Sequence, residues 1–460
     1  MNRNISKTNY MKGLQCPKLL WTCFNDVKQI PEANVATQAN FDEGHAVGCQ
    51  AQALYPNGVL VLRDEEGFGA MLRRTQELLP QRRPIFEATF ASGGCCAQAD
   101  ILNPVENGLW DVVEVKKSTS VKPQHYQDVA MQRHCYEGAG IPIRRCFLMH
   151  INNQYVSHGE VDPQGLLAAE DLTDAVAGIL PGIPNRIAQM QEVIAQKTCP
   201  AVAVGPHCDT PYACPLKAAC WAERGTAEEH VQPAGDLTCD CGAVQRFMSG
   251  LVYPLHLLDF ETFMTAIPRF DNCRPYRQIP FQFSLHVVEH LDLPPVHHSW
   301  LWDGAGAPRS IMLTELRKVI GATGSVMAYN KCFEEGCLRE SAAAFPTHKG
   351  FIDELMPRMV DLASPFRSHQ VCHPAQEGSW SLKAVLPALT GLGYDDLAIG
   401  DGGTASTEFM RVMLTEVAPE DRAEVRKNLE EYCGLDTYGM LAILRKLDAM
   451  SRQDRKAIQT

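Results

Sequence analysis

Apolar and polar positions follow strand and helix periods in two stretches of the chain. Between residues 84 and 157, the runs IFEATFAS, CCAQADILN, LWDVVEVKKS and RRCFLMHINN predict strands, and a helix over about residues 122–137 interrupts them. Two helical segments follow between residues 163 and 196, separated by the breaker PGIP. After residue 250 the strands LHLLDFETF, IPFQFSLHVVEH and SVMAYN alternate with helical stretches. The pattern therefore predicts an α/β protein.

A polar region with Pro and Gly lies between the two stretches, at about residues 224–250. Such composition is typical of a domain boundary. We predict a first domain over residues 1–225, a linker over 226–250, a second domain over 251–450 and a C-terminal tail over 451–460. CDC at residues 239–241 and the pair His297–His298 complete no ligand pattern, so we interpret them as linker and strand residues.

Composition narrows the class of protein. The 460 residues are 45% apolar, which is enough for two or three cores, and no apolar run approaches the ~20 residues of a membrane span. The start MNRNISKTNYMKGLQ is polar, so we expect a cytoplasmic protein with no membrane partner, whose 18 cysteines are mostly reduced. A net charge of −12 argues against non-specific coating of nucleic acid, although carboxylate-rich metal sites contribute to that charge.

Two carboxylates stand together in LDFETF. Residues i and i+2 of a strand point to one side, so Asp259 and Glu261 face the same way and repel each other. A divalent cation that prefers oxygen ligands removes this repulsion, whereas a solvated strand end is the alternative. Further along, AYNKCFE supplies Glu334, and YCGLD places Tyr432 and Asp436 four residues apart on a predicted helix.

These three motifs, in this order and spacing, resemble the DEDD (DnaQ-like) exonuclease superfamily, which has a ribonuclease-H-like fold. The resemblance implies metal ligands at Asp259, Glu261 and Asp436, and a water-activating phenol at Tyr432. The superfamily usually has aspartate at the position of Glu334, whose longer side chain would reach a metal directly or through water; alternatively the role passes to Asp361. By the same resemblance, nucleic acid lies near Asn330 and near Lys383 in GSWSLKAVLPAL, where the alternative for Ser381 is a helix N-cap.

The first half carries a second acidic pattern. Asp100 ends one strand, and Glu114 and Lys116 lie on one face of the next, in the spacing D-x13-E-x-K. Carboxylates at this spacing hold Mg²⁺ or Mn²⁺ while the lysine orients water or neutralises a phosphorane. A solvated salt bridge between neighbouring strands is the alternative.

Further residues accompany this pattern: His45 upstream, Glu87 on the preceding strand, and Gln132 with Tyr136 on the following helix. Together they resemble PD-(D/E)xK nucleases of the RecB type, which have a restriction-endonuclease-like fold. The resemblance implies that His45, Asp100 and Glu114 hold Mg²⁺ or Mn²⁺. It also implies that the Q-x-x-x-Y pair contacts the nucleic-acid strand near the scissile phosphate.

Four cysteines extend the resemblance to the iron–sulfur subset of RecB-type nucleases, which includes the CRISPR-associated exonuclease. Cys16 lies near the start, and Cys208, Cys214 and Cys220 follow the predicted core. The resemblance implies a structural 4Fe-4S cluster on these four thiolates. The spacing C-x5-C-x5-C replaces the usual C-x2-C-x5-C, and zinc or a group of buried thiols are the alternatives.

The whole arrangement resembles a bacterial family described as a domain of unknown function, in which both nuclease types are joined. It implies a metal-dependent exonuclease acting on DNA, preferring single-stranded ends, with RNA as an alternative substrate. A second hypothesis is a nucleic-acid-binding component whose C-terminal domain recognises ends or docks a partner. A small-molecule metallohydrolase is a third.

Overall fold

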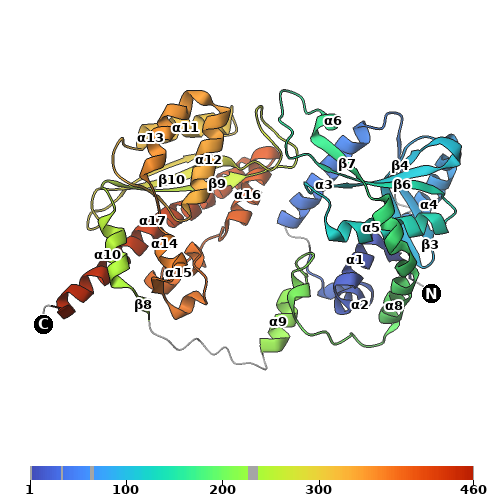
Figure 1. Ribbon diagram of the computed structural model, residues 1–460, viewed down its shortest axis with the longest axis horizontal. Helices are drawn as coiled ribbons and strands as arrows, with labels where there is room; N and C mark the ends of the chain where they lie inside the picture. The colour runs from blue at the N-terminus through green and yellow to red at the C-terminus, as the bar shows by residue number, and fades with distance from the viewer. Residues whose placement is uncertain (1–2, 33–34, 63–66, 226–236, 459–460) are drawn as a thin grey trace. The chain divides into compact units, whose positions relative to one another are not determined.

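The computed structural model describes residues 3–32, 35–62, 67–225 and 237–458. The chain divides into two compact units, the first comprising Met1–Glu229 with Thr265–Tyr276 and the second His230–Met264 with Arg277–Thr460. Each unit has its own β-sheet with helices packed against it (Figure 1). The predicted α/β class is therefore confirmed for both units.

Unit 1 is built on a mixed seven-stranded sheet of order β2-β3-β4-β5-β6-β7, with β1 parallel to β4. Its strands are β1 (Ile5–Ser6), β2 (Val59–Leu60), β3 (Ile85–Ser92), β4 (Cys95–Pro104), β5 (Trp110–Lys116), β6 (Ile143–Ile151) and β7 (Leu167–Asp171). Its helices are α1 (Lys7–Gln15), α2 (Pro17–Asn25), α3 (Val35–Ala53), α4 (Phe68–Leu78), α5 (Pro123–Gly138), α6 (Pro163–Leu166), α7 (Thr173–Ile179), α8 (Ile183–Ala195) and α9 (Lys217–Gly225).

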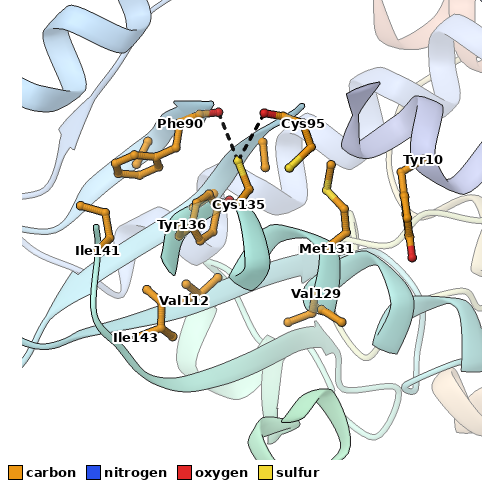
Figure 2. Close-up of a cluster of buried hydrophobic side chains, with 14 of the residues drawn as sticks. Tyr10, Phe90, Cys95, Val112, Val129, Met131, Cys135, Tyr136, Ile141 and Ile143 are labelled. Carbon is orange, nitrogen blue, oxygen red and sulfur yellow. Dashed lines mark hydrogen bonds between the residues drawn. The ribbon is translucent and has the colours of Figure 1, made fainter. Parts of the chain in front are cut away.

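Helix α5 is the element that fixes the core on one face of this sheet. It begins at Pro123, whose missing N–H costs nothing in the first helical turn. Tyr136 packs edge-on against Phe90 with ring centroids 5.2 Å apart, and the Cys135 thiol donates to the carbonyl of Phe90 (Figure 2). These contacts orient the polar side of α5 towards the end of β5.

A second, smaller core contains residues of α3 and the sheet together with Ala266 of the segment Thr265–Tyr276. The Ala266 amide donates to Glu43 at 2.7 Å, and the Tyr276 hydroxyl donates to the carbonyl of Lys117. This segment, which lies between β9 and β10 in the sequence, is therefore part of unit 1.

Unit 2 has a five-stranded sheet of order β11-β10-β9-β12-β13 and a two-stranded ribbon of β14 and β8. Its strands are β8 (Thr238–Cys239), β9 (Leu255–Phe263), β10 (Ile279–Val288), β11 (Val296–Leu301), β12 (Val326–Ala328), β13 (Met359–Asp361) and β14 (Val371–Cys372). Its helices are α10 (Cys241–Ser249), α11 (Pro308–Val319), α12 (Lys331–Ala344), α13 (Lys349–Leu355), α14 (Ser364–Arg367), α15 (Leu382–Thr390), α16 (Gly402–Leu414) and α17 (Pro419–Ile458).

The boundaries of the predicted linker and tail need correction. Residues 226–236 lie outside the described residues, but β8 pairs with β14 and α10 follows directly, both within the predicted linker. Helix α10 is capped by the Asp240 side chain, which accepts from the amide of Ala243. At the C-terminus, α17 continues to Ile458 through most of the predicted tail. The polar composition of these residues predicted a loop. The structure instead has a helix, stabilised by the Asp240 cap, and a strand, stabilised by pairing with β14.

The two faces of β9 have different partners: one face packs in a hydrophobic core, and the other carries the acidic side chains. Leu258 and Phe260 contribute to a core with residues of α11 and α12. On the opposite face, Phe263 packs with Phe281 of β10 and Phe409 of α16, and the last two rings stack 3.8 Å apart. Asp259 and Glu261 share the face of Phe263 because their positions differ by two.

Among the described residues, the structure contains no helix that combines the length and the apolar character needed to cross a bilayer.

Phe409→Ala should destabilise the protein by about 3–5 kcal/mol, since it deletes a fully buried ring from the aromatic stack beside β9. Thermal and urea unfolding would measure the loss. Leu293→Ala, at a side chain 51% exposed, is the control and should change stability by less than about 0.5 kcal/mol. Equal effects of the two substitutions would contradict this account of the core.

Candidate functional site

Acidic side chains of unit 2 gather on the sheet face that α17 covers. In β9, Asp259 lies opposite Ser284 of β10, and Glu261 lies opposite Gln282. Ligand atoms of Asp259, Glu261 and Cys433 lie within 4.8 Å of one another. Cys433, one residue after Tyr432 on α17, was not predicted, because a buried cysteine in a helix carries no distinctive sequence signal.

The other predicted acids of unit 2 also face this group. Glu334 lies in the first turn of α12, Asp436 lies on α17, and both are buried. Burial raises the pKa of Glu261 to about 8, with added repulsion from Asp436, and burial raises the pKa of Glu334 to about 8. The pKa of Asp259 is raised well above its ordinary value by burial and by these three neighbours. Among the described residues, the positive charge near these carboxylates is therefore too small to keep all of them ionised at neutral pH.

Asp361, the alternative to Glu334, is already engaged. Its Oδ2 accepts from Arg367 at 2.6 Å, and its Oδ1 accepts from the amide of Ala363 at 3.0 Å. Glu334 Oε2, in contrast, is buried without a hydrogen-bond partner in the described part of the chain. Of the two, Glu334 is thus the acid that retains capacity to bind a cation.

Two phenols accompany Asp436, of which only Tyr432 was predicted. The Tyr394 hydroxyl donates to Asp436 Oδ1, and its ring centroid lies 5.9 Å from that of Tyr432. Burial raises the pKa of Asp436 to about 6, and the Tyr394 hydrogen bond and Lys383 limit the increase. Tyr394 lies in the loop between α15 and α16, with no fixed spacing to the other site residues, so only the tertiary structure identifies it.

Lys383, predicted at the nucleic acid, lies beside both phenols. Its Nζ is 5.1 Å from the ring centroid of Tyr432 and 5.4 Å from that of Tyr394, and it donates to the carbonyl of Gly400 at 2.6 Å. Ser381 occupies the N-cap of α15 without a side-chain cap hydrogen bond. Asn330, also predicted at the nucleic acid, is exposed at the N-cap of α12.

The donor set of this unit 2 group fits a divalent cation. Several buried carboxylates repel one another, and two buried acceptors, Glu334 Oε2 and Gln282 Oε1, have no hydrogen-bond partner among the described residues. Oxygen-rich, negatively charged sites of this kind are what Mg²⁺ and Mn²⁺ prefer.

In unit 1, the polar residues centre on Glu114 of β5, which is 1% exposed. Its Oε1 receives the ammonium groups of Lys116 at 2.6 Å and Lys7 at 2.7 Å, and its Oε2 accepts from Gln132 at 2.7 Å. Burial alone would raise the pKa of Glu114, but the two ammonium groups outweigh it and hold the pKa far below its ordinary value. This carboxylate is therefore ionised and fully paired.

The Q-x-x-x-Y pair is buried beside Glu114. Gln132 and Tyr136 are both 0% exposed; the Tyr136 hydroxyl donates to Gln132 Oε1 at 2.8 Å, while Gln132 donates to Glu114 and to Asp128. Neither side chain reaches the surface in this structure, and their contact with nucleic acid stays a prediction. The pair orients Glu114, because a buried amide must satisfy its own hydrogen bonds.

Lys7 and Asp128 belong to this network and were not predicted. Asp128 accepts from Lys116 at 2.8 Å and lies one helical turn before Gln132. The i,i+4 spacing of Asp128 and Gln132 could have identified Asp128 from the sequence. No sequence pattern could have identified Lys7, which lies 107 residues from Glu114.

Asp100 and Glu87 lie near Glu114, and His45 is close enough to Glu87 for its charge to lower the pKa of that carboxyl, against the larger effect of burial. Asp100 Oδ2 accepts from the Val115 amide at 2.6 Å, and burial with repulsion from Glu114 raises the pKa of Asp100 to about 7. Glu87 has a left-handed backbone (φ 57°), a strained conformation of a kind that clusters at functional sites. His45 is exposed on α3, and in the described residues no group of three ligand atoms within 4.8 Å combines it with these acids.

The four predicted cluster cysteines do gather in space. Cys16, Cys208, Cys214 and Cys220 line one small pocket of unit 1, within a patch of apolar side chains. A tetrahedral zinc site holds sulfurs about 3.8 Å apart, given Zn–S bonds of about 2.3 Å. Among the described residues, no three of these sulfurs lie within 4.8 Å of one another. Four thiols around one pocket supply the number of ligands that a 4Fe-4S cluster takes, and also the number that a zinc ion takes.

Comparison with known proteins gives a partial match. Residues 256–381 match a family model described as "Domain of unknown function (DUF2779)", which includes Asp259, Glu261 and Glu334 but ends before α17. An uncharacterized protein of Mycoplasma pneumoniae, an MG366 homolog, is 26% identical over 207 residues, and the match covers 40% of this chain and 31% of the relative. Uncharacterized protein MG366 of Mycoplasma genitalium is 25% identical over 205 residues, with the same shares. The chain thus spans about a third of the length of these relatives.

Lys7→Met should destabilise the protein by about 1–3 kcal/mol, because buried Glu114 loses one of its two ammonium partners. The folded pKa of Glu114 is depressed, so the loss should be complete above the ordinary value of 4.5 and shrink as pH falls below it. Urea unfolding between pH 3 and 7 would measure this. Lys117→Met, in a partly exposed pair with Glu43, is the control and should cost less than about 1 kcal/mol.

Without divalent cations, stability should fall as pH rises from 5 to 8. Glu261 and Glu334 have folded pKa values of about 8 against 4.5 for the unfolded chain, so the folded state binds more protons in this window. In chelator at pH 8, Glu334→Gln should therefore raise the melting temperature, and Mn²⁺ should raise that of the wild type.

Glu335→Gln, one residue along α12 and paired with Lys331 at 3.4 Å, is the matched control and should leave the melting temperature unchanged. A melting temperature that is flat with pH and insensitive to Mn²⁺ would contradict the interpretation of this acidic group.

Proposed function

We propose that the chain is a metal-dependent nuclease that hydrolyses phosphodiester bonds of DNA at single-stranded ends, with one site in each unit. The proposal rests on one observation: four acids and a phenol of unit 2 are buried close enough to shift one another's pKa values. They are Asp259, Glu261, Glu334, Asp436 and Tyr432. These residues come from β9, α12 and α17, and structural packing alone gives no reason to bury four acids together.

At the unit 2 site, the chain's residues would bind and orient the strand end. Mg²⁺ or Mn²⁺, when held by Asp259, Glu261, Glu334 and Asp436, would neutralise phosphate charge and lower the pKa of water. The Tyr432 hydroxyl, which hydrogen-bonds Asp436, would turn to the attacking water. Burial and the neighbouring carboxylates keep its pKa above the ordinary value, so it would start as a donor. Lys383 would contact the phosphate backbone. We assign unit 2 to the ribonuclease-H-like DEDD fold on this basis.

At the unit 1 site, Lys116 is the residue that would stabilise charge on the phosphate. Its ammonium lies between Glu114 and Asp128, where it is held in place by two carboxylates. Asp100 and Glu114 would supply oxygen ligands for a cation, which would have to replace Lys7 on Glu114. We assign unit 1 to the PD-(D/E)xK fold of the RecB type.

The four-cysteine pocket would hold a 4Fe-4S cluster on Cys16, Cys208, Cys214 and Cys220. These residues tie the turn between α1 and α2 to the segment after α8, so the cluster's contribution would be structural. Thiols and a cluster of this kind fit a reducing cytoplasm, which we propose as the location.

The test is digestion of end-labelled single- and double-stranded DNA and RNA with Mn²⁺ or Mg²⁺, using anaerobically purified wild type, Lys116→Ala and Asp259→Ala. We expect each substitution to remove a different product ladder, with at least about a hundredfold lower rate at its own site. Circular dichroism would check that both variants are folded.

Either of two outcomes would change the assignment. If Lys116→Ala abolishes all cleavage and Asp259→Ala changes nothing, unit 2 recognises ends or docks a partner instead of cutting. If neither substitution affects cleavage by the preparation, the nuclease proposal is wrong.

A further inference from the structure

The cysteine on α17 distinguishes the unit 2 group from an all-oxygen site. Cys433 is 0% exposed, and its thiol donates to Asp259 Oδ2 at 3.6 Å. Its sulfur and one oxygen each of Asp259 and Glu261 form the group whose ligand atoms lie within 4.8 Å in the described part of the chain. Asp436 and Glu334 raise the pKa of Asp259 but stand outside that group.

Asp436, which lies outside the group, has hydrogen-bond partners of its own. Its Oδ1 accepts from the hydroxyl of Tyr394, in the loop between α15 and α16. Cys433 lies one helical turn earlier on the same side of α17, next to Asp259. The helix therefore presents a thiol, in addition to a carboxylate, to the two acids of β9.

A second observation indicates that the group binds a ligand. Glu334 is 4% exposed, and its Oε2 has no hydrogen-bond partner among the described residues although its charge acts on both Asp259 and Glu261. A buried carboxylate oxygen left without a donor costs stability unless something pairs with it. A cation between Glu334 and the β9 acids would do so.

We infer that Cys433 is a further metal ligand of the unit 2 site, through which the site binds a thiophilic divalent cation, such as Co²⁺ or Zn²⁺, more tightly than the Mg²⁺ or Mn²⁺ of the proposed function. On binding, the sulfur–metal bond forms, the thiol proton leaves to solvent and the hydrogen bond to Asp259 Oδ2 is replaced by coordination. Thiolates prefer borderline and soft ions, whereas Mg²⁺ requires near-octahedral oxygen ligands. The inference rests on the divalent-cation site of the proposed function and adds its selectivity.

The experiment is titration of the full-length chain with Co²⁺, followed by near-ultraviolet absorption, where thiolate-to-cobalt charge transfer appears. Any unit 1 cysteine that is free of a cluster would add a thiolate–cobalt signal of its own, so spectra of wild type minus Cys433→Ser isolate the unit 2 signal. We expect a charge-transfer band in this difference spectrum and at least about tenfold weaker Co²⁺ binding in the variant, since even outer-shell partners cost about that much. Excess Mg²⁺ should displace Co²⁺ from Cys433→Ser more readily than from the wild type.

Cys337→Ser is the matched control, because Cys337 is a buried thiol of α12 that also lies near Glu334 and Asp259 but is outside the ligand group. It should retain the band. Cys433→Ala, checked by thermal melting, should lose the band as Cys433→Ser does, which separates lost coordination from effects of a buried hydroxyl.

Identical bands in wild type and Cys433→Ser would overturn the inference. Asp259→Asn then separates the two levels of the argument. If Asp259→Asn lowers Co²⁺ binding without any change in the thiolate band, the divalent-cation site stands and Cys433 is only a hydrogen-bond donor. If Asp259→Asn leaves Co²⁺ binding unchanged, the cation site of the proposed function fails as well.

Discussion

Carboxylates buried near one another repel strongly because the protein interior screens charge poorly, and both candidate sites are organised by this constraint. In unit 1 the repulsion is met from within the chain: Lys7 and Lys116 pair with Glu114, and Lys116 also pairs with Asp128. In unit 2, the described residues give the acids around Asp259 no comparable set of cationic partners, since Lys383 acts on Glu261 and Asp436 without a salt bridge to either. The acids of unit 1 are thus neutralised by lysine side chains of the chain, whereas those of unit 2 would be neutralised by a bound cation.

Each site depends on a strand whose other face supplies the packing. Leu258 and Phe260 hold β9 against α11 and α12, so that Asp259 and Glu261 are fixed on the face under α17. In unit 1, α5 plays the corresponding role, since its apolar residues fix it to the sheet while Gln132 reaches Glu114. Rigid support of this kind keeps charged ligands in place despite their repulsion.

Residue spacing within one strand correctly predicted which side chains lie close together. The family resemblance did not predict which side chains are exposed. The i,i+2 pair on β9 shares a face, as strand geometry requires. Gln132 and Tyr136 were expected at a nucleic-acid strand, yet both are buried and serve Glu114. His45, expected beside the acids of unit 1, lies exposed on α3, where its charge acts on Glu87. Exposure depends on what other elements cover a residue, which the motif does not encode.

The amino-acid sequence by itself determined the α/β class, the division into two halves, the strands that carry the acids and the cysteines that share a pocket. The class and the strands follow from periodicity, which acts over a few residues, whereas the grouping of Cys16 with the three later cysteines followed from the family resemblance. Only the tertiary structure decided that Lys7 neutralises Glu114, that Tyr394 binds Asp436, and that Cys433 contacts Asp259. These partners lie 42 to 174 residues apart, and their contacts arise from how helices pack on the sheets, so no local pattern specifies them.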